Sequence, residues 1–523
     1  MIRPRLIYYN DAHHFHGKRV EPPVSRHMLQ WPVDEVAGTS VDLLVLGLGY
    51  SDVFFHQTKV GRVVGQQKEV WENFIDWRIM RMVEAAAELG TDQLREVVER
   101  GRQVGVRVFP SLKMQDSSRP GGERFGSLKM EHGAAVCCGD EGRAEWCYNY
   151  ADERVREYKL ALLREVFEDY QSDGIELDYQ FDSTYFKASE TAEQTPVMTR
   201  FVAQVRELAR EVGEQQGREI PIMARVALDR EVNLDMGLDV EAWIADGSLD
   251  YVVGQDKRVL VQTDPMPDWM PKAANANGAA AYYRPPRRIY DERVGLPSIE
   301  MYRALGMTLQ QQGFAGQYHG YFPWPFAERE YQILRELGHP EVFGRYEKRY
   351  TLQPREGVAD EPTTTPERQV PVELEEGQTH RVTIRVADDL AGAKADGEMR
   401  KPILTLRFSF FCIEDEIEFR INGRPLPWEE AEINDERALT IPVKLAGSMH
   451  LQAPLGMSAH WFRYRLDLDD LQAGENVIEI ECRRFDAKAG FARSLNGLEI
   501  KTRYRDFVRP EGMSMERVAP PSG

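Results

Sequence analysis

The sequence has few cysteines, and their spacing is not that of a disulfide framework. Only five occur in 523 residues, an odd number scattered over a long chain, whereas disulfide-stabilised domains are small and cysteine-dense. Cys137, Cys138 and Cys147 are close in sequence, but neighbouring cysteines rarely share one tetrahedral metal site and no fourth ligand is evident. We therefore expect free thiols at all five positions.

Long apolar runs are also missing, and basic residues are outnumbered. No stretch of about 18 apolar residues occurs, so no membrane-spanning helix is expected, and no apolar signal segment precedes the first strand-like run. The 66 Lys and Arg residues stand against 85 Asp and Glu residues, for a net charge of -19. This balance argues against broad binding to nucleic acid or anionic membranes, but it does not exclude a local basic pocket. We expect a cytoplasmic protein without a cofactor, and homo-oligomerisation is compatible with the sequence.

The first 340 residues alternate short β-rich runs with helical patterns. Strand–helix alternation of this length predicts a parallel sheet covered by helices. The β-rich runs occupy residues 5–11, 41–49, 105–114, 173–181, 220–228, 250–256, 279–284 and 313–322. A TIM barrel is closed by eight parallel strands, which is the number of β-rich runs here. An open doubly wound sheet would need a glycine-rich phosphate turn after the first strand, and residues 10–17 (NDAHHFHG) are not one. The prediction is an α/β fold with a TIM (β/α)₈ barrel over residues 1–345.

The pattern changes after residue 345. Residues 346–368 contain the run Asp-Glu-Pro-Thr-Thr-Thr-Pro and are expected to be a linker. From 369 to 509 short runs alternate with period two, and Asn422-Gly423 marks a tight hairpin. Many short strands with turn signals predict a β-sandwich of the jelly-roll type. Residues 510–523 are expected to be disordered.

One segment carries most of the chemical information, Asp-Gly-Ile-Glu-Leu-Asp-Tyr-Gln at residues 173–180. Residues two apart in a strand share a face, so Glu176, Asp178 and Gln180 are expected to face the barrel interior. Polar groups there are costly unless they are paired. A buried ion pair between Glu176 and Arg225 of the next strand would satisfy the deeper carboxylate. Asp178 lies nearer the C-terminal mouth, where barrel enzymes build their active sites, so we predict that it is catalytic.

Residues 173–180 resemble the strand-four signature of the family 18 chitinases and related glycoside hydrolase barrels. More broadly, residues 1–340 resemble uncharacterised glycosyl-hydrolase-like barrels whose fourth strand reads Asp-Gly-Ile-x-Leu-Asp. The resemblance implies a barrel that acts on carbohydrate. In the chitinases the signature ends in a glutamate that acts as general acid, whereas this chain has Gln180 there, which cannot donate a catalytic proton. The C-terminal domain resembles galactose-binding-like modules, which implies an accessory role or glycan binding.

Glycoside hydrolysis normally needs two carboxyl groups that flank the scissile bond. The expected partner of Asp178 is Asp256, which follows the sixth run, because some retaining glycosidase barrels use aspartates on strands four and six. Asp229 and Asp11 are the next choices. Each of the three could instead cap a helix or pair with a base.

Other polar and aromatic groups at the strand ends would suit a sugar, which is bound by aromatic faces and planar hydrogen-bonding groups. Lys113, Arg225 and Arg284 could contact a carboxylate or sulfate of the substrate, or form structural ion pairs. Gln317, His319 and Tyr321 are expected to share one face of the eighth strand. The predicted substrate-binding residues are Asn10, Asp11, Lys113, Glu176, Gln180, Arg225, Asp229, Tyr283, Arg284, Gln317, His319 and Trp324.

Two alternatives to a glycoside hydrolase stay open. His13, His14 and His16 resemble the paired histidines of metal-dependent amidohydrolase barrels, although the expected lysine on strand four and histidines on strands five and six are absent. The other alternative is a carbohydrate-binding barrel without catalysis, which Gln180 would allow. In the C-terminal domain Trp428 and Trp461 could bind glycan or belong to the core.

Overall fold

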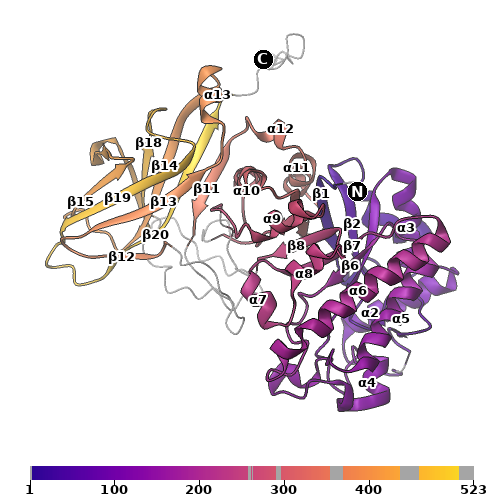
Figure 1. Cartoon of the computed structure of the whole chain (residues 1–523). Coiled ribbons are helices and arrows are strands. Elements are labelled where there is room, and N and C mark those ends of the chain that lie inside the picture. The colour runs from indigo at the N-terminus through magenta and orange to yellow at the C-terminus, as the bar shows by residue number, and fades with distance from the viewer. Residues whose placement is uncertain are drawn as a thin grey trace, which may run out of the picture.

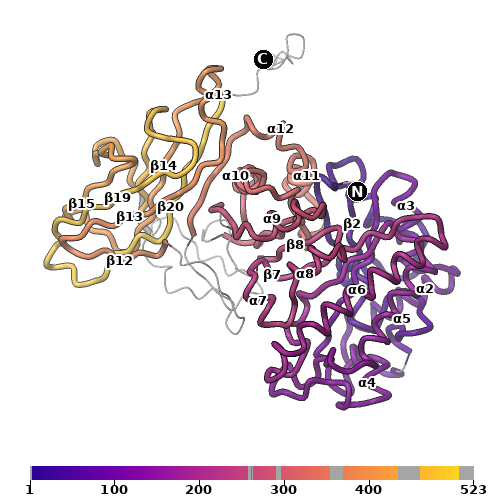
Figure 2. Tube along the Cα trace, in the orientation of Figure 1, coloured from indigo at the N-terminus to yellow at the C-terminus, as the bar shows by residue number. Residues whose placement is uncertain are grey.

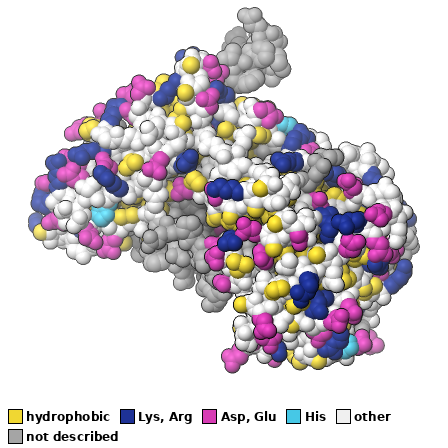
Figure 3. All heavy atoms as spheres, viewed as in Figure 1, with side chains coloured by type: hydrophobic (Ala, Val, Ile, Leu, Met, Phe, Trp, Pro, Cys, Tyr) yellow, Lys and Arg dark blue, Asp and Glu magenta, His cyan; other side chains and the backbone are white. Residues whose placement is uncertain are grey.

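The computed structural model describes residues 3–66, 68–256, 261, 263–289, 296–353, 369–435 and 459–505. Within them the chain forms a helix-covered parallel barrel followed by an antiparallel β-sandwich, which lie side by side as two lobes (Figure 1). The predicted fold class is therefore confirmed. On the face in Figure 3, acidic and basic side chains are interspersed over both lobes.

Eight parallel strands close into a barrel in the order β1-β10-β9-β8-β7-β6-β5-β2. Closure is completed by β1, which pairs with β10 on one side and β2 on the other. The strands are β1 (Leu6–Asn10), β2 (Val41–Gly47), β5 (Arg107–Lys113), β6 (Ile175–Asp178), β7 (Ile222–Ala227), β8 (Tyr251–Gln255), β9 (Ala280–Arg284) and β10 (Gly316–Gly320). Each strand falls inside one of the eight β-rich runs found in the sequence.

Helices cover the outside of the barrel (Figure 1). Several begin where an aspartate side chain accepts a hydrogen bond from a free backbone N–H of the first turn, as Asp92 and Asp152 do for α3 and α5. The helices of the barrel are α1 (Arg26–Asp34), α2 (Phe74–Glu88), α3 (Gln93–Val104), α4 (Ser127–His132), α5 (Glu153–Tyr170), α6 (Thr191–Gln216), α7 (Arg230–Asp235), α8 (Val240–Ala245), α9 (Trp269–Ala276), α10 (Ile299–Gln311), α11 (Glu328–Glu336) and α12 (Pro340–Phe343). None of the described helices has both the length and the apolar character needed to cross a membrane.

The barrel interior is filled by side chains rather than open. Its apolar members form one buried cluster, made of Ile7, Tyr9, Leu43, Val45, Phe109, Met223, Tyr251, Val253, Ala280, Tyr282 and Tyr318. Alternate residues of the same strands pack outward against the helices. The cluster leaves no open channel, and the carboxyl ends of the strands above it are where a barrel places its functional side chains.

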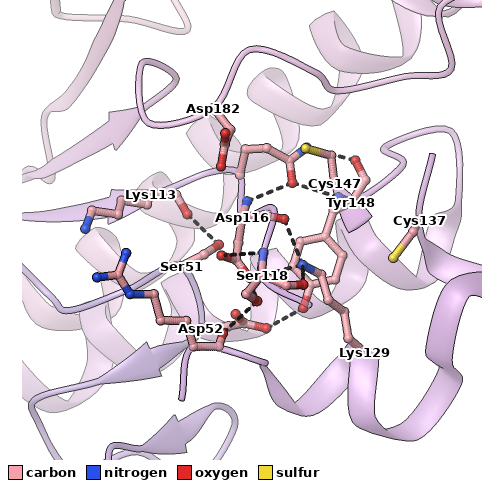
Figure 4. A network of polar contacts seen from close by, with 12 residues as sticks. Ser51, Asp52, Lys113, Asp116, Ser118, Lys129, Cys137, Cys147, Tyr148 and Asp182 are labelled. Atoms are coloured by element: carbon pink, nitrogen blue, oxygen red, sulfur yellow. Dashed lines mark hydrogen bonds and ion pairs between the residues drawn. The ribbon is translucent and has the colours of Figure 1, made fainter. Parts of the chain in front are cut away.

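The two long loops after β2 and β5 are held by buried charges. Lys129 of α4 donates to Asp116 over 3.0 Å, and both side chains are at most 3% exposed. Tyr148 donates a hydrogen bond to the buried Asp52, and Lys159 of α5 lies 2.8 Å from the Ser51 hydroxyl. Figure 4 shows this network joining the two loops. The loops are therefore fixed in place by ion pairs and hydrogen bonds.

Two antiparallel sheets form the C-terminal sandwich. One has the order β11-β20-β14-β18-β17, with β12 also paired to β20, and the other has the order β13-β19-β15-β16. The strands are β11 (Lys348–Leu352), β12 (Val372–Leu374), β13 (Thr379–Val386), β14 (Met399–Ser409), β15 (Glu416–Ile421), β16 (Arg424–Leu426), β17 (Glu432–Asp435), β18 (Ala459–Arg465), β19 (Gly474–Arg484) and β20 (Arg493–Tyr504). A short helix, α13 (Leu390–Ala395), follows β13.

The sandwich begins earlier than the sequence suggested. Part of the predicted linker is β11, which pairs with β20 over its whole length, while residues 354–368 and 510–523 lie outside the described residues. In Figures 1 and 2, α10 lies on the side of the barrel next to the sandwich. Gln311 of this helix donates a hydrogen bond to the carbonyl of Ala387 at 3.0 Å. The two lobes therefore share a contact through α10.

Candidate active site at the barrel mouth

The deepest polar group is Glu176 on β6, which is fully buried. It accepts hydrogen bonds from Ser111 at 2.7 Å and from the Tyr318 hydroxyl at 2.8 Å. Arg225 Nε lies 3.4 Å from the same carboxylate, which confirms the predicted ion pair. Burial raises the pKa of Glu176, although Arg225 opposes this shift. Glu176 is thus a structural group that anchors Arg225 beneath the mouth.

Asp178 lies one step nearer the mouth and is 2% exposed. One carboxylate oxygen is 2.5 Å from Arg225 Nη2, and the other accepts a hydrogen bond from the backbone N–H of Gln180 at 2.8 Å. Burial disfavours the charge of Arg225, but Asp178 and Glu176 together raise the pKa of the guanidinium well above its usual value. Arg225 is therefore a charged group shared by both carboxylates.

Lys113 at the end of β5 is close to two carboxylates at once. Its ammonium donates a hydrogen bond to the Gly49 carbonyl at 2.9 Å and lies 4.2 Å from the centre of the Phe181 ring. Burial lowers the pKa of Lys113 to about 8, and the nearby Asp178 and Asp11 charges oppose this shift. In Figure 4 its side chain points away from Asp116 and Lys129, so it belongs to the mouth rather than to the loop network.

Asp11 follows β1 and is paired with His14. The Asp11 Oδ1 to His14 Nδ1 distance is 2.5 Å, and the two side chains are 16% and 21% exposed. Burial would raise the pKa of Asp11, but His14 and Lys113 hold it below its usual value. Asp11 is therefore an ionised carboxylate that solvent can reach and that lies near Lys113.

Gln255 at the end of β8 joins two arginines. Its side-chain oxygen accepts hydrogen bonds from Arg225 and Arg284, each at 2.7 Å. The Arg284 guanidinium also lies 5.6 Å from the ring centre of Tyr9 and 5.3 Å from that of Tyr321. The sequence analysis did not predict Gln255 or Tyr9 as site residues. Both side chains point into the barrel, and side-chain alternation would predict this once the direction of one other residue in the same strand is known.

The structure corrects the prediction for Asp256. It follows Gln255, which points inward, so its own side chain points outward and accepts a hydrogen bond from Tyr283 at 2.7 Å. Tyr283 packs in the outer cluster between strands and helices and contacts Phe314. Neither Asp256 nor Tyr283 joins Asp178 in the mouth. Asp229 is also elsewhere, because it caps α7 through the N–H groups of its first turn.

The predicted face of β10 is also wrong. Tyr318 reaches Glu176 in the interior, so Gln317 and His319 point outward to α10. The His319 ring packs edge-on to Tyr302 of that helix, and burial lowers its pKa to about 3. His319 is a neutral core histidine and not a sugar ligand.

Three further residues were predicted to bind the substrate, namely Asn10, Gln180 and Trp324. Among the described residues, the buried Asn10 Nδ2 and Gln180 Oε1 have no hydrogen-bond partner. Trp324 is 40% exposed, with its ring against the Arg19 guanidinium at 4.6 Å and its N–H bonded to Glu35 at 2.7 Å. Of these three residues, only the Trp324 side chain is substantially exposed.

The histidines and the sandwich tryptophans have structural contacts. His16 is fully buried against Phe55, and burial lowers its pKa to about 4. No group of three His, Cys, Asp or Glu side chains suited to a metal occurs within the described ranges. Trp428 donates a hydrogen bond to the Ile417 carbonyl and packs against core phenylalanines. Trp461 is 7% exposed. All five cysteines are free, as predicted.

No protein-family model and no curated protein sequence matches the chain. Among solved structures, a cycloisomaltooligosaccharide glucanotransferase of Paenibacillus sp. is 11% identical, with 95% of this chain and 57% of that chain covered and a TM-score of 0.34. An alpha-L-fucosidase isoenzyme 2 from Paenibacillus thiaminolyticus is 12% identical, with coverage of 66% and 50% and a TM-score of 0.40. A glycoside hydrolase family 18 N-acetylglucosaminidase from Paenibacillus barengoltzii is 12% identical, with coverage of 63% and 98% and a TM-score of 0.35.

The chain thus spans about half the length of the first two of these structures. The fold itself rests on the strand pairing, which is that of a closed eight-stranded parallel barrel with an antiparallel sandwich behind it. At the mouth of this barrel the chain brings together Asp178, Asp11, Lys113, Arg225 and Arg284, and it leaves Asp256, Asp229, Tyr283, Gln317 and His319 outside.

Proposed function

We propose that the chain is a glycoside hydrolase that cleaves O-glycosyl bonds of an oligo- or polysaccharide, with Asp178 and Asp11 as its two carboxylates. The observation that carries the proposal is that Asp178 ends β6 in register with Lys113 of β5 and Asp11 directly follows β1, so that both carboxylates lie at the same end of the barrel and near Lys113. Two carboxyl groups on either side of a site are what glycoside hydrolysis requires. In this proposal Asp11 is the second catalytic carboxylate, instead of Asp256, which the sequence suggested.

The surroundings of the two carboxylates suit different roles. Asp178 is paired with Arg225, and a carboxylate in such an ion pair suits a nucleophile or a stabiliser of a cationic sugar. Asp11 is more exposed, and its pKa is held below the usual value beside His14, so it suits a general base that accepts a proton from water. The sandwich, in this proposal, is an accessory domain that packs beside α10.

A carbohydrate-binding barrel without catalysis is the second candidate. Asp178 is 2% exposed, and both of its oxygens are already bonded, one to Arg225 and one to the Gln180 backbone. A carboxylate this buried offers little surface to a sugar. This observation favours binding alone.

One comparison separates the candidates. Release of reducing sugar from a panel of oligosaccharides is measured for the wild type and for Asp178→Asn, Asp11→Asn and Asp256→Asn, with sugar binding measured in parallel by calorimetry. For the enzyme, we expect Asp178→Asn and Asp11→Asn to lower kcat by about 10²–10⁴ while sugar binding persists. Asp256→Asn should stay within about threefold of the wild type, because it changes an outward contact.

Wild-type protein that binds sugars tightly but releases no product would favour the second candidate. Turnover that survives both Asp178→Asn and Asp11→Asn would refute the assignment of the two carboxylates.

A further inference from the structure

Two arginines beyond β9 lie against the same aromatic ring. The guanidinium carbons of Arg284 and Arg287 are 5.3 Å and 5.1 Å from the centre of the Tyr321 ring. Tyr321 itself has a φ of 57°, in the left-handed region where a bulky residue is strained. Backbone strain of this kind persists where the surrounding structure enforces it, and it is concentrated at functional sites.

Neither guanidinium has an acidic partner among the residues that the structure describes. The hydrogen bond of Arg284 goes to the neutral Gln255 side chain, and that of Arg287 goes to the Tyr321 carbonyl at 2.9 Å. Partial loss of hydration, and then the adjacent Arg284 charge, lower the pKa of Arg287. Two like charges held side by side in this way are unfavourable until an anion joins them.

Lys113 adds a third cation, which forms no direct ion pair among the described residues although Asp178 and Asp11 lie near it. Its hydrogen bond is to the Gly49 carbonyl, whereas Arg225 nearby is paired with both Glu176 and Asp178. Arg284 and Arg287 are thus adjacent cations in a chain whose net charge is -19. A concentration of cations against the overall charge indicates a specific anionic ligand.

We propose that Arg284 and Arg287 form an anion subsite over Tyr321, so that the substrate of the mouth is an acidic saccharide carrying a carboxylate or a sulfate. This inference rests on the function proposed above. The planar guanidinium fork binds either group through two parallel hydrogen bonds. Gln255 connects Arg284 to Arg225 and hence to Asp178, so an anion held by Arg284 would place its sugar ring next to that carboxylate.

The test is direct binding, which does not depend on turnover. Calorimetry on the full chain compares four ligand types of equal length: oligosaccharides that contain uronic acid, the same oligosaccharides after reduction of the carboxyl to an alcohol, sulfated oligosaccharides, and their desulfated forms. Proteins are the wild type, Arg284→Gln and Arg287→Gln. The control is Arg164→Gln on α5, which makes the same charge change at an exposed pair with Glu211.

We expect the wild type and Arg164→Gln to bind at least one acidic ligand about tenfold or more tightly than its neutral counterpart, since a charge-assisted hydrogen bond has about that effect. Arg284→Gln should reduce this preference to within about threefold. Arg287→Gln, whose side chain is exposed, should reduce it in part without a change in thermal stability. The uronic acid and sulfate arms identify which anion is preferred.

Equal binding of acidic and neutral ligands, binding of neither acidic ligand, or a preference that both arginine variants retain would overturn the inference. These outcomes differ from a failure of the proposed function. Cleavage of neutral saccharides with no acidic preference would remove the subsite and leave the hydrolase, whereas an acidic preference without cleavage of any ligand would retain the subsite and remove the hydrolase.

Discussion

The buried triad of Glu176, Arg225 and Asp178 gives the most direct test of the barrel interior. Arg225→Met would leave two carboxylates in a region where all three side chains are at most 4% exposed. Removing one partner of a buried ion pair costs about 3–5 kcal/mol of stability. We therefore expect the free energy of unfolding at pH 7.5 to fall by about that amount.

The loss should shrink as the pH falls. Burial already raises the pKa of Glu176, and Arg225 opposes this shift, so its removal raises the folded-state pKa further. Between the unfolded and folded pKa values the folded variant binds more protons than the unfolded chain, and its stability therefore decreases with rising pH. The slope is about 1.4 kcal/mol per pH unit for each carboxyl group, so the deficit at pH 5.5 should be smaller than at pH 7.5.

The assay must report on the barrel alone, because two domains need not unfold together. Urea unfolding followed by hydrogen exchange of amides in β6 and β7 meets this need. Arg206→Met is the matched control, since Arg206 pairs with Asp250 at 2.5 Å where the side chains are 19% and 28% exposed; its cost should be below about 1 kcal/mol. A deficit for Arg225→Met below about 1 kcal/mol, or one that does not change with pH, would refute the reasoning.

Three other predictions concern different parts of the barrel. Lys129→Met breaks the buried pair with Asp116 and should cost about 3–5 kcal/mol, seen as faster amide exchange in residues 115–150; unchanged exchange there would contradict it. Gly47→Ala places a Cβ 2.8 Å from the Asp11 carbonyl oxygen and should lower stability by about 1–3 kcal/mol and kcat for glycoside cleavage more than tenfold; wild-type kinetics would count against the role of Asp11. Lys113 has a pKa of about 8 in the folded protein, compared with 10.5 for an unperturbed lysine. Between these two pH values the unfolded chain binds more protons than the folded protein. The free energy of unfolding of the wild type therefore rises from pH 8 to pH 10. Lys113→Met should flatten this rise in urea titrations at pH 8, 9 and 10, and an unchanged slope would exclude the lowered pKa.

The sequence by itself determined the architecture. Eight β-rich runs separated by helical patterns predicted the number of strands, and every barrel strand lies inside one of those runs. Period-two alternation also determined the inward direction of Glu176 and Asp178, and the ion pair with Arg225 followed from the cost of leaving a carboxylate buried alone. These features depend on neighbours in one strand or on two adjacent strands.

The tertiary structure alone decided which residues meet at the mouth. Alternation states that Gln255 and Asp256, or Tyr318 and His319, point to opposite sides, but it does not state which of each pair points inward. Closure of eight strands decides this, because the interior accepts the inward set that packs around Phe109 and Tyr251. The approach of Asp11 to Lys113, and of two arginines to the Tyr321 ring, likewise joins strands far apart in sequence. Such contacts arise only when the whole barrel packs together, so they cannot be predicted from local sequence patterns.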